Sequence, residues 1–398
     1  MAHSHVHRDE VPSVEVSRGP LVVLLGFLAV CAVATVVGVV ALWPDAAEVS
    51  RLQERAQYSA PGVSFEKATV ETVQDVCPTG DAGQVDCGNI QAALTTGPDS
   101  GESELVGVPP GVSESGLAEG DTVRLMRIPG AAGEPSMYSF DDVIRLKPLW
   151  LLAALFVLVV GVVARARGLL ALVSLAFGGL VLFRFMLPAL LSGSDGLAVS
   201  LAGSAAIMFV VLYLAHGPST RTSAALAGTL LGVGIIAAVG EVAVQGANIS
   251  GFGSEDAALL SAFADTVSFQ GLFSCAIIVA GLGILNDVTI TQASSVWELR
   301  EAGPELSRRT LFASAMRIGR DHIASSIYTI VFAYAGSALA VLLLLSLYDR
   351  PVLDLLSTEA IAEEIVRTLA SGIGLVLAVP VTTAIAAFTV TGPRASTD

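Results

Sequence analysis

Residues 269–287 read FQGLFSCAIIVAGLGILND, an apolar run that ends in an asparagine and an aspartate. About 20 residues of helix cross a hydrocarbon core of roughly 30 Å, so this run is long enough to span a membrane. A carboxylate at the edge of a span is costly unless it is paired or titrates. Asp287 is therefore the first candidate for a functional group.

The composition indicates a polytopic membrane protein. Of 398 residues, 53% are hydrophobic and 14% are charged, and the mean hydropathy is +0.72. The apolar runs are continuous rather than alternating, which favours transmembrane helices over a barrel. We expect a polytopic α-helical membrane protein with about eight spans, at residues 21–43, 149–163, 169–191, 197–214, 224–244, 269–287, 323–347 and 369–388.

These runs predict the domain organisation. We expect a disordered tail at 1–20, an anchor helix at 21–43, a small β domain at 44–147, a seven-helix membrane domain at 148–391 and a second tail at 392–398. The first run could be a secretory signal, but it exceeds the usual apolar core of about 7–15 residues. A retained anchor is the preferred interpretation.

The arginines predict the orientation, because cytoplasmic loops of membrane proteins carry an excess of Lys and Arg. Loops 192–196 and 245–268 contain neither residue, and 348–364 contains only Arg350. The opposite side collects Arg8, Arg18, Arg165, Arg167, Arg221, Arg300, Arg308, Arg309, Arg317, Arg320 and Arg394. We therefore expect both termini in the cytoplasm and the β domain outside it. Abundant Ala, Val and Gly, with Arg far above Lys, indicate a GC-rich bacterial genome, so we expect the protein in a bacterial cell membrane.

The long polar segment carries five stretches with β-branched or alternating apolar residues between turn residues, at 68–76, 89–95, 104–108, 121–128 and 137–146. Cys77 and Cys87 lie in this segment, and in an oxidising compartment they could form a disulfide. The alternative is two free thiols.

Several classes of function are disfavoured. The net charge is −15 and lysine occurs only at Lys67 and Lys147, which argues against binding of nucleic acid. We find no phosphate-binding loop, zinc-protease helix, nucleophile elbow or cysteine quartet, so we expect no enzyme and no cofactor. His3, His5 and His7 could capture a divalent metal weakly, but a disordered tail is favoured and no metal site is predicted.

Two charged residues fall inside spans. At about 1.5 Å per residue, Arg184 lies roughly 24 Å and Glu241 roughly 25 Å from the cytoplasmic ends of their spans. Matching depths predict an ion pair, because an unpaired charge in the membrane is expensive. The alternative is that each side chain extends alone to the outer interface.

Counting from the external end of its span puts Asp287 near the cytoplasmic rim. Arg317, Arg320 and His322, with Asp321 among them, precede the next span and could neutralise Asp287 or exchange protons with it. The alternative is a helix end whose charges face the lipid headgroups.

Several motifs together resemble the bacterial YibE/F-like membrane proteins. They are GLGILNDV at 281–288, SSVWE at 294–298, RIGRD at 317–321, AYAG at 333–336, EEIVR at 363–367 and SGIGLVLAVP at 371–380. The resemblance covers about residues 65–390 and implies one anchor helix, an external β domain and about seven further helices. It implies no established biochemical activity.

The region around Asp287 also resembles, more distantly, a hairpin of resistance-nodulation-division transporters and of SecD and SecF. That likeness implies that Asp287 binds a proton, that Asn286 and Thr291 are its hydrogen-bond neighbours, and that Arg320 switches partner. The chain departs from the pattern, because it has one such hairpin and a far smaller external domain.

Three functions compete. A proton- or ion-coupled transporter explains the charges in the spans. A non-catalytic envelope or export accessory protein, binding a partner through its external domain, explains the β domain. A membrane-embedded enzyme lacks a recognisable nucleophile or metal site. A polar cavity reaching Asp287 would favour transport, whereas a solid bundle with an apolar patch on the external domain would favour the accessory role. The lipid bilayer is the one partner that the sequence predicts; it does not identify a protein partner or a substrate.

Overall fold

The computed structural model describes residues 14–55, 62–74, 88–130, 134–347 and 351–392. The chain divides into two compact units. One comprises residues 1–55 and 163–398, and the other comprises residues 56–162. The first is helical and the second is built on a β-sheet, and each is considered by itself.

The sheet has five strands, which overlap the five predicted stretches. They are β1 (Ser64–Val73), β2 (Asn89–Leu94), β3 (Ser103–Gly107), β4 (Thr122–Ile128) and β5 (Met137–Val143). Their order is β3-β2-β1-β4-β5, and all neighbours are antiparallel. A short helix, α3 (Pro110–Ser113), lies between β3 and β4. The sheet confirms the prediction of a small β domain.

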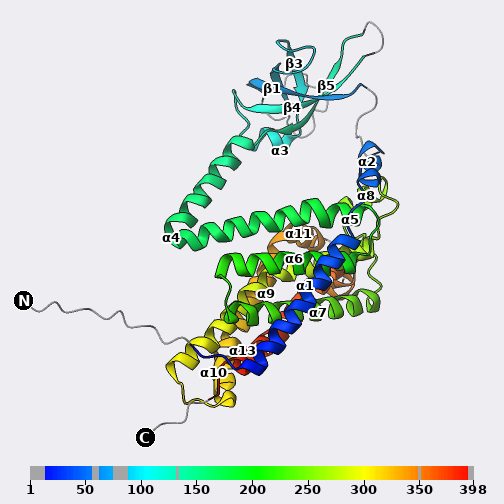
Figure 1. Ribbon diagram of the computed structural model, residues 1–398. Helices are drawn as coiled ribbons and strands as arrows, with labels where there is room; N and C mark the ends of the chain where they lie inside the picture. Colours follow the sequence, from blue (N-terminus) through cyan, green and yellow to red (C-terminus); the bar gives the residue numbers. More distant parts are fainter. Residues whose placement is uncertain (1–13, 56–61, 75–87, 131–133, 348–350, 393–398) are drawn as a thin grey trace, which may run out of the picture. The chain divides into compact units, whose positions relative to one another are not determined.

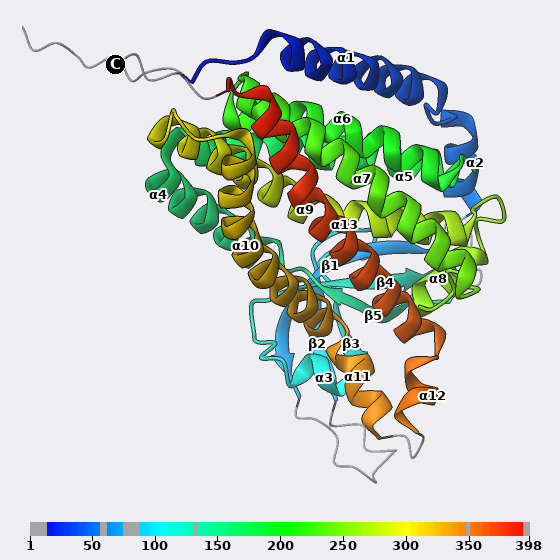
Figure 2. The same ribbon diagram turned by 90° about the horizontal axis from the view of Figure 1, so that it is seen from below.

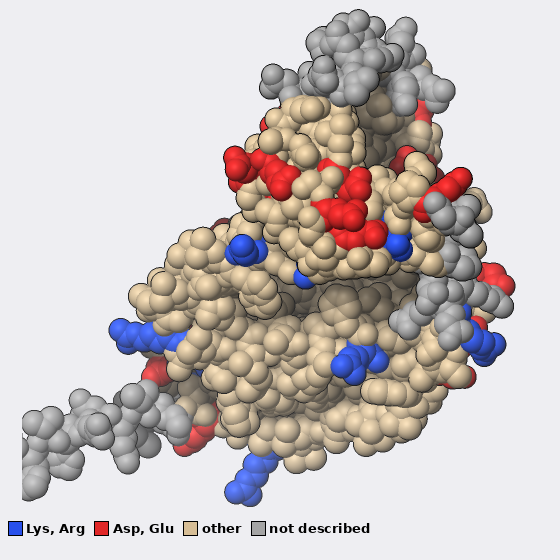
Figure 3. All heavy atoms as spheres, turned by 90° about the horizontal axis from the view of Figure 1, so that it is seen from above, with Lys and Arg blue, Asp and Glu red and all other residues tan. Residues whose placement is uncertain are grey.

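Alternation along the strands gives this unit a core of its own. Ala68 of β1 pairs with Leu94 of β2 and with Val123 of β4, and all three side chains are buried. The opposite face mixes charged side chains, such as Lys67 and Arg124, with apolar ones, such as Phe65 and Met126. Figure 3 shows acidic side chains gathered on one face of the molecule. Asp99 accepts hydrogen bonds from Arg127 Nε of β4 (3.0 Å) and from Tyr138 Oη of β5 (2.6 Å). The unit is thus a folded, mostly acidic module.

The remaining elements are helices (Figures 1 and 2). Their bounds are α1 (Arg18–Ala41), α2 (Ala46–Arg55), α4 (Leu146–Val181), a π-helical segment (Leu182–Met186), α5 (Leu187–Leu191), α6 (Gly196–His216), α7 (Thr220–Gly246), α8 (Glu255–Ser261), α9 (Phe269–Ala302), α10 (Arg308–Ser337), α11 (Leu339–Ser346), α12 (Val352–Leu356) and α13 (Glu359–Thr389). Within the described residues, six helices are long and apolar enough to cross a membrane, or seven if the bent pair α10 and α11 forms one span.

The predicted second and third spans belong to one helical stretch, Leu146–Leu191, of 46 residues. At about 1.5 Å per residue this stretch is roughly 69 Å long, more than twice a hydrocarbon core. Its backbone leaves helical geometry at Arg165 (φ 53°, ψ −141°), which is where the sequence predicted a loop. The expected eight spans are reached only if the stretch crosses twice, divided at Arg165.

The predicted seventh span, 323–347, is not a single straight helix. Helix α10 begins at Arg308 and ends at Ser337, and α11 continues at an angle of 67°. The bend follows Gly336-Ser337, and Gly/Ser pairs are among the common causes of sharp helix bends. The basic segment and the apolar segment that the sequence separated therefore form one helix.

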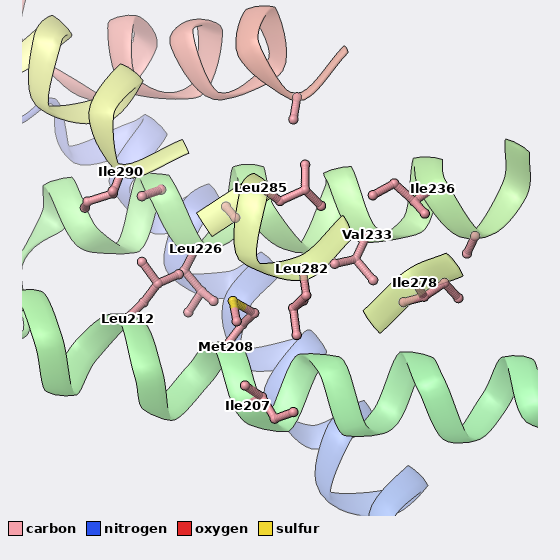
Figure 4. Close-up of a cluster of buried hydrophobic side chains, with 14 of the residues drawn as sticks. Ile207, Met208, Leu212, Leu226, Val233, Ile236, Ile278, Leu282, Leu285 and Ile290 are labelled. Atoms are coloured by element: carbon pink, nitrogen blue, oxygen red, sulfur yellow. The ribbon is translucent and has the colours of Figure 1, made fainter. Parts of the chain in front are cut away.

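Helices α7, α9 and α13 form the centre of the helical unit, packed through glycines. A Cβ built on Gly232 of α7 would lie 2.9 Å from Cδ2 of Leu285 of α9, and one on Gly374 of α13 would lie 2.1 Å from Cγ1 of Ile236 of α7. Small residues let helix backbones approach closely in membranes. Figure 4 shows the apolar side chains of α6, α7 and α9 that fill this core.

The start of α1 meets the end of α13. Ser17 N donates to Thr389 O (2.9 Å), Thr391 N donates to Glu15 O (2.9 Å), and Val16 and Val390 form an antiparallel bridge. The first and last helices of the chain therefore begin and end at the same end of the helical unit. The placement of both termini in the cytoplasm stays a prediction.

Candidate functional site

Asn286 and Asp287 lie in the interior of α9, which continues without a break to Ala302. Gly196 at the start of α6 packs on the backbone of Gly271, where a Cβ would lie 2.1 Å from the Gly271 carbonyl oxygen. Measured from this contact, Asp287 lies about 24 Å along α9. His216, the last residue of α6, lies about 30 Å along α6. Asp287 is thus less than two helical turns short of the end of the neighbouring helix.

Asp287 is exposed, and it forms no hydrogen bond or ion pair through its carboxylate with any residue that the structure describes. Thr291 does lie beside it, but its hydroxyl donates to the backbone carbonyl of Asp287 (2.8 Å) and not to the carboxylate. The role expected for Thr291 is therefore not reproduced.

The predicted relay of Arg320, Asp321 and His322 is also not assembled around Asp287. None of the three is bonded to its carboxylate in the described part of the chain. The reason is the direction in which α10 packs, since Gly319 faces α9 and α13, with Val379 Cγ1 at 2.7 Å from its ideal Cβ. The next two residues are rotated by about 100° and 200° from that contact. Both are exposed.

Asn286 lines a cavity of about 750 Å³ between α4, α6 and α9. Most of its walls are apolar, and the polar side chains among the lining residues are Arg167, Ser174, His216 and Asn286. Asn286 Oδ1 is buried and has no hydrogen-bond partner in the described residues. Gly283 also lines the cavity. Asp287 is not among the lining residues; since residues four apart share a helix face, it lies one turn beyond Gly283.

The cavity wall includes an irregular helical segment. Leu182 and Met186 are the first and last residues of the π-helical segment, and both line the cavity. π-Helical turns are rare and occur frequently at functional sites. The π-helical segment and Asn286 thus line the same cavity.

Polar side chains also form contacts between the three central helices, α7, α9 and α13. Thr229 Oγ1 of α7 and Thr289 Oγ1 of α9 are 2.7 Å apart, and Thr383 Oγ1 of α13 donates to Gln292 Oε1 of α9 (2.9 Å). All four side chains are fully buried. The sequence alone gave no indication of these pairings.

The predicted ion pair between Arg184 and Glu241 is not formed. Glu241 accepts hydrogen bonds from Gln245 Nε2 (2.6 Å) and from Ser274 Oγ (3.4 Å). Arg184 lies in the π-helical segment, where it is exposed and has no partner among the described residues. Equal depth did not bring the two together, because depth does not fix the face on which a side chain lies.

Two other sequence predictions fall outside the described residues, namely the disulfide of Cys77 and Cys87 and the histidines His3, His5 and His7. The cysteines of the spans, Cys31 and Cys275, are free thiols. In the described ranges, no group of three or more His, Cys, Asp or Glu side chains is arranged to hold a metal.

Sequence reasoning missed a contact at the other end of α13. The carboxylate of Glu359 accepts hydrogen bonds from the backbone of Ser250 (2.8 Å) and Gly251 (3.1 Å), and Glu363 accepts one from Gly253 (2.9 Å). The sequence does contain a signal for this contact: two glutamates lie four residues apart at the start of a helix, so they share one helix face. These bonds fix the loop after α7 to α13.

A protein-family model described as YibE/F-like protein matches residues 152–392. The chain belongs to the YibE/F-like family. The match includes Asn286, Asp287 and the whole cavity, and it confirms the resemblance for the helical part of the chain. No curated protein and no solved structure matches the chain significantly. The likeness to resistance-nodulation-division transporters therefore stays a prediction.

Proposed function

We propose that this YibE/F-like protein is a proton- or ion-coupled transporter, and that the cavity between α4, α6 and α9 is part of its transport path. The proposal assigns no catalytic chemistry to the chain. It places the protein in the bacterial cell membrane with its arginine-rich side in the cytoplasm. The observation that carries it is a cavity lined by Asn286, the residue that directly precedes Asp287 in α9.

The size and lining of the cavity support this proposal. A volume of about 750 Å³ falls within the range of about 300–1,000 Å³ that is usual for small-molecule sites. Apolar walls with a few polar groups are also typical of such sites. Arg167 and His216 line the cavity at the ends of their spans, on the side predicted to be cytoplasmic.

Asp287 supports a coupled mechanism. Carboxylates in membrane spans are rare and often belong to ion pathways or proton relays. Asp287 has no partner that neutralises it among the described residues, and it lies one turn from the cavity-lining Gly283. Its carboxylate is thus free to bind a proton or a cation, while Asn286, which lines the cavity, has a buried amide oxygen with no hydrogen-bond partner among the described residues.

The test is ion flux in proteoliposomes that contain the full chain. An entrapped pH-sensitive dye reports proton movement under an imposed pH gradient, with Na⁺ or K⁺ gradients as separate arms. The account predicts faster flux than in empty vesicles and its loss in Asp287→Asn. Glu298→Gln, a change at an exposed carboxylate of the same helix, is the matched control and should keep the flux. Wild-type flux equal to that of empty vesicles in every arm would refute the proposal.

A second candidate, the accessory role, is favoured by the sheet unit. The edge strands β3 and β5 expose Leu105 and Met137, which are 52% and 71% accessible. Exposed strand edges can add a strand from a partner protein. If this is the function, changing Leu105 and Met137 together to Ser would abolish the cellular role of the protein and leave any ion flux intact.

A further inference from the structure

A groove of about 650 Å³ lies between α10 and α13, away from the cavity. It is lined by Arg308, Arg309 and Phe312 from α10 and by Ala384, Ala387 and Phe388 from α13. Figure 2 shows the two helices side by side. The groove combines two cations with a small apolar wall.

Both arginines keep their charge uncompensated. Arg308 Nη2 donates to Ser17 Oγ (2.8 Å) and to the carbonyl oxygen of Val390 (3.2 Å), and both acceptors are neutral. Arg309 is exposed, and its side chain forms no hydrogen bond with the residues that the structure describes. No ion pair joins either guanidinium to a carboxylate in the described residues. The groove therefore has a net positive rim.

The other half of the groove is suited to hydrocarbon. Phe388 is 60% exposed, and the side chains of Ala384 and Ala387 are small enough to leave room beside it. Phe388 lies in the last turn of α13, at the end of the span predicted at 369–388. The arginines therefore lie at headgroup level, with apolar wall toward the membrane interior.

We propose that this groove binds an anionic phospholipid, with its phosphate on Arg308 and Arg309 and the upper part of one acyl chain against Phe312 and Phe388. Guanidinium groups bind phosphate oxygens in bidentate geometry. Anionic lipids concentrate on the cytoplasmic leaflet, where basic residues near the surface attract them. Because Arg308 also holds Ser17 and Val390, the bound lipid lies beside the contact that joins the start of α1 to the end of α13.

The experiment measures lipid retained by the purified full chain with native mass spectrometry. Phosphatidylglycerol is compared with phosphatidylcholine at equal concentration. The test variant is Arg309→Gln, because the Arg309 side chain is exposed and makes no hydrogen bond within the described part of the chain. The matched control is Arg317→Gln, an exposed arginine of the same helix outside the groove. A second variant, Ala384→Leu, fills the groove without changing its charge.

The proposal expects phosphatidylglycerol to be retained in preference to phosphatidylcholine. Arg309→Gln should weaken that binding about five-fold, and Arg317→Gln should leave it unchanged. Ala384→Leu should also reduce it. Equal retention of both lipids, or equal losses in the two arginine variants, would overturn the proposal. Displacement of the lipid by millimolar inorganic phosphate would overturn it too, because it would show a site for free anions.

Discussion

Gln292 of α9 accepts a hydrogen bond from Thr383 of α13, with 2.9 Å between Oε1 and Oγ1. Both side chains are fully buried among apolar neighbours. A polar group in such surroundings is costly unless it finds a partner, so the bond favours one register of the two helices. Gly319 of α10 packs against the same amide, at 2.9 Å from Nε2 to its ideal Cβ. The side chain of Gln292 therefore contacts both α10 and α13 from α9.

The first prediction concerns this bond. Thr383→Val and Gln292→Met should each destabilise the protein, and the double variant should cost less than the sum. The expected coupling energy is about 0.6 kcal/mol, the average for hydrogen bonds between membrane helices. Chemical unfolding in detergent micelles measures it. Strictly additive costs would show that the two side chains do not interact.

A second prediction compares two glycines of α13. Gly374→Ala should destabilise the protein by about 1–3 kcal/mol, because its new methyl group would lie 2.1 Å from Ile236 Cγ1. Gly372→Ala is the control, since nothing lies within 4 Å of its ideal Cβ. Thermal unfolding of the two variants should separate them clearly. Similar melting temperatures would contradict the close approach of α7 and α13.

The third prediction concerns the pH dependence of the sheet unit. Burial, and then the hydrogen bond to Asp99, raise the pKa of Tyr138 to about 12. Because the ordinary value is about 10, the folded state keeps this proton longer than the unfolded state. The stabilisation is complete below about pH 10 and is lost as the pH rises toward 12.

Phenolate absorbance measures this titration in a chain with six tyrosines. Tyr138→Phe should remove a component that titrates near pH 12. Tyr328→Phe, at an exposed tyrosine of the helical unit, should leave that component in place. If the difference between wild type and Tyr138→Phe titrates at the ordinary value, the burial of Tyr138 is contradicted.

A fourth prediction concerns the loop after α7. Glu359→Gln should weaken the bonds to the Ser250 and Gly251 amides, since a neutral amide oxygen is a poorer acceptor than a carboxylate. Hydrogen bonds to charged groups contribute about 1.5–3 kcal/mol, so amide exchange there should rise by about 10-fold or more. Hydrogen exchange read by mass spectrometry resolves the loop. Glu255→Gln, on exposed α8, is the control; the same rise there would contradict a specific role of Glu359.

The sequence predicted the elements of this fold better than their contacts. Strand stretches were recognisable because β-branched residues lay between turn residues, and spans because apolar runs were long. The division at Arg165 was predicted, because Arg165 and Arg167 interrupt the apolar run, but the bend after Ser337 depends on small residues within an otherwise apolar stretch. Hydropathy averages over such residues, so it gave the number of spans only approximately.

The candidate site was predicted only in part, because sequence position gives some coordinates of a side chain and not others. Counting residues along a helix gives depth, and it placed Asp287 near the inner rim of its span. Counting does not say which face a side chain occupies. Arg184 and Glu241 were therefore paired wrongly, and Arg320 was expected beside Asp287 although Gly319 occupies the packed face of α10. The cavity beside Asn286 arises where α9 packs near α4 and α6, which lie far from it in sequence.

The most direct test of the transport account uses Gly283→Cys in a chain whose four native cysteines are replaced. Gly283 lines the cavity and has open space around its ideal Cβ, so a cysteine fits there. Gly234→Cys, equally open but outside the cavity, is the control. A charged, membrane-impermeant thiol reagent should react with Gly283→Cys and stop ion flux in proteoliposomes, without effect on Gly234→Cys. Complete modification of Gly283→Cys with undiminished flux would contradict a path through this cavity.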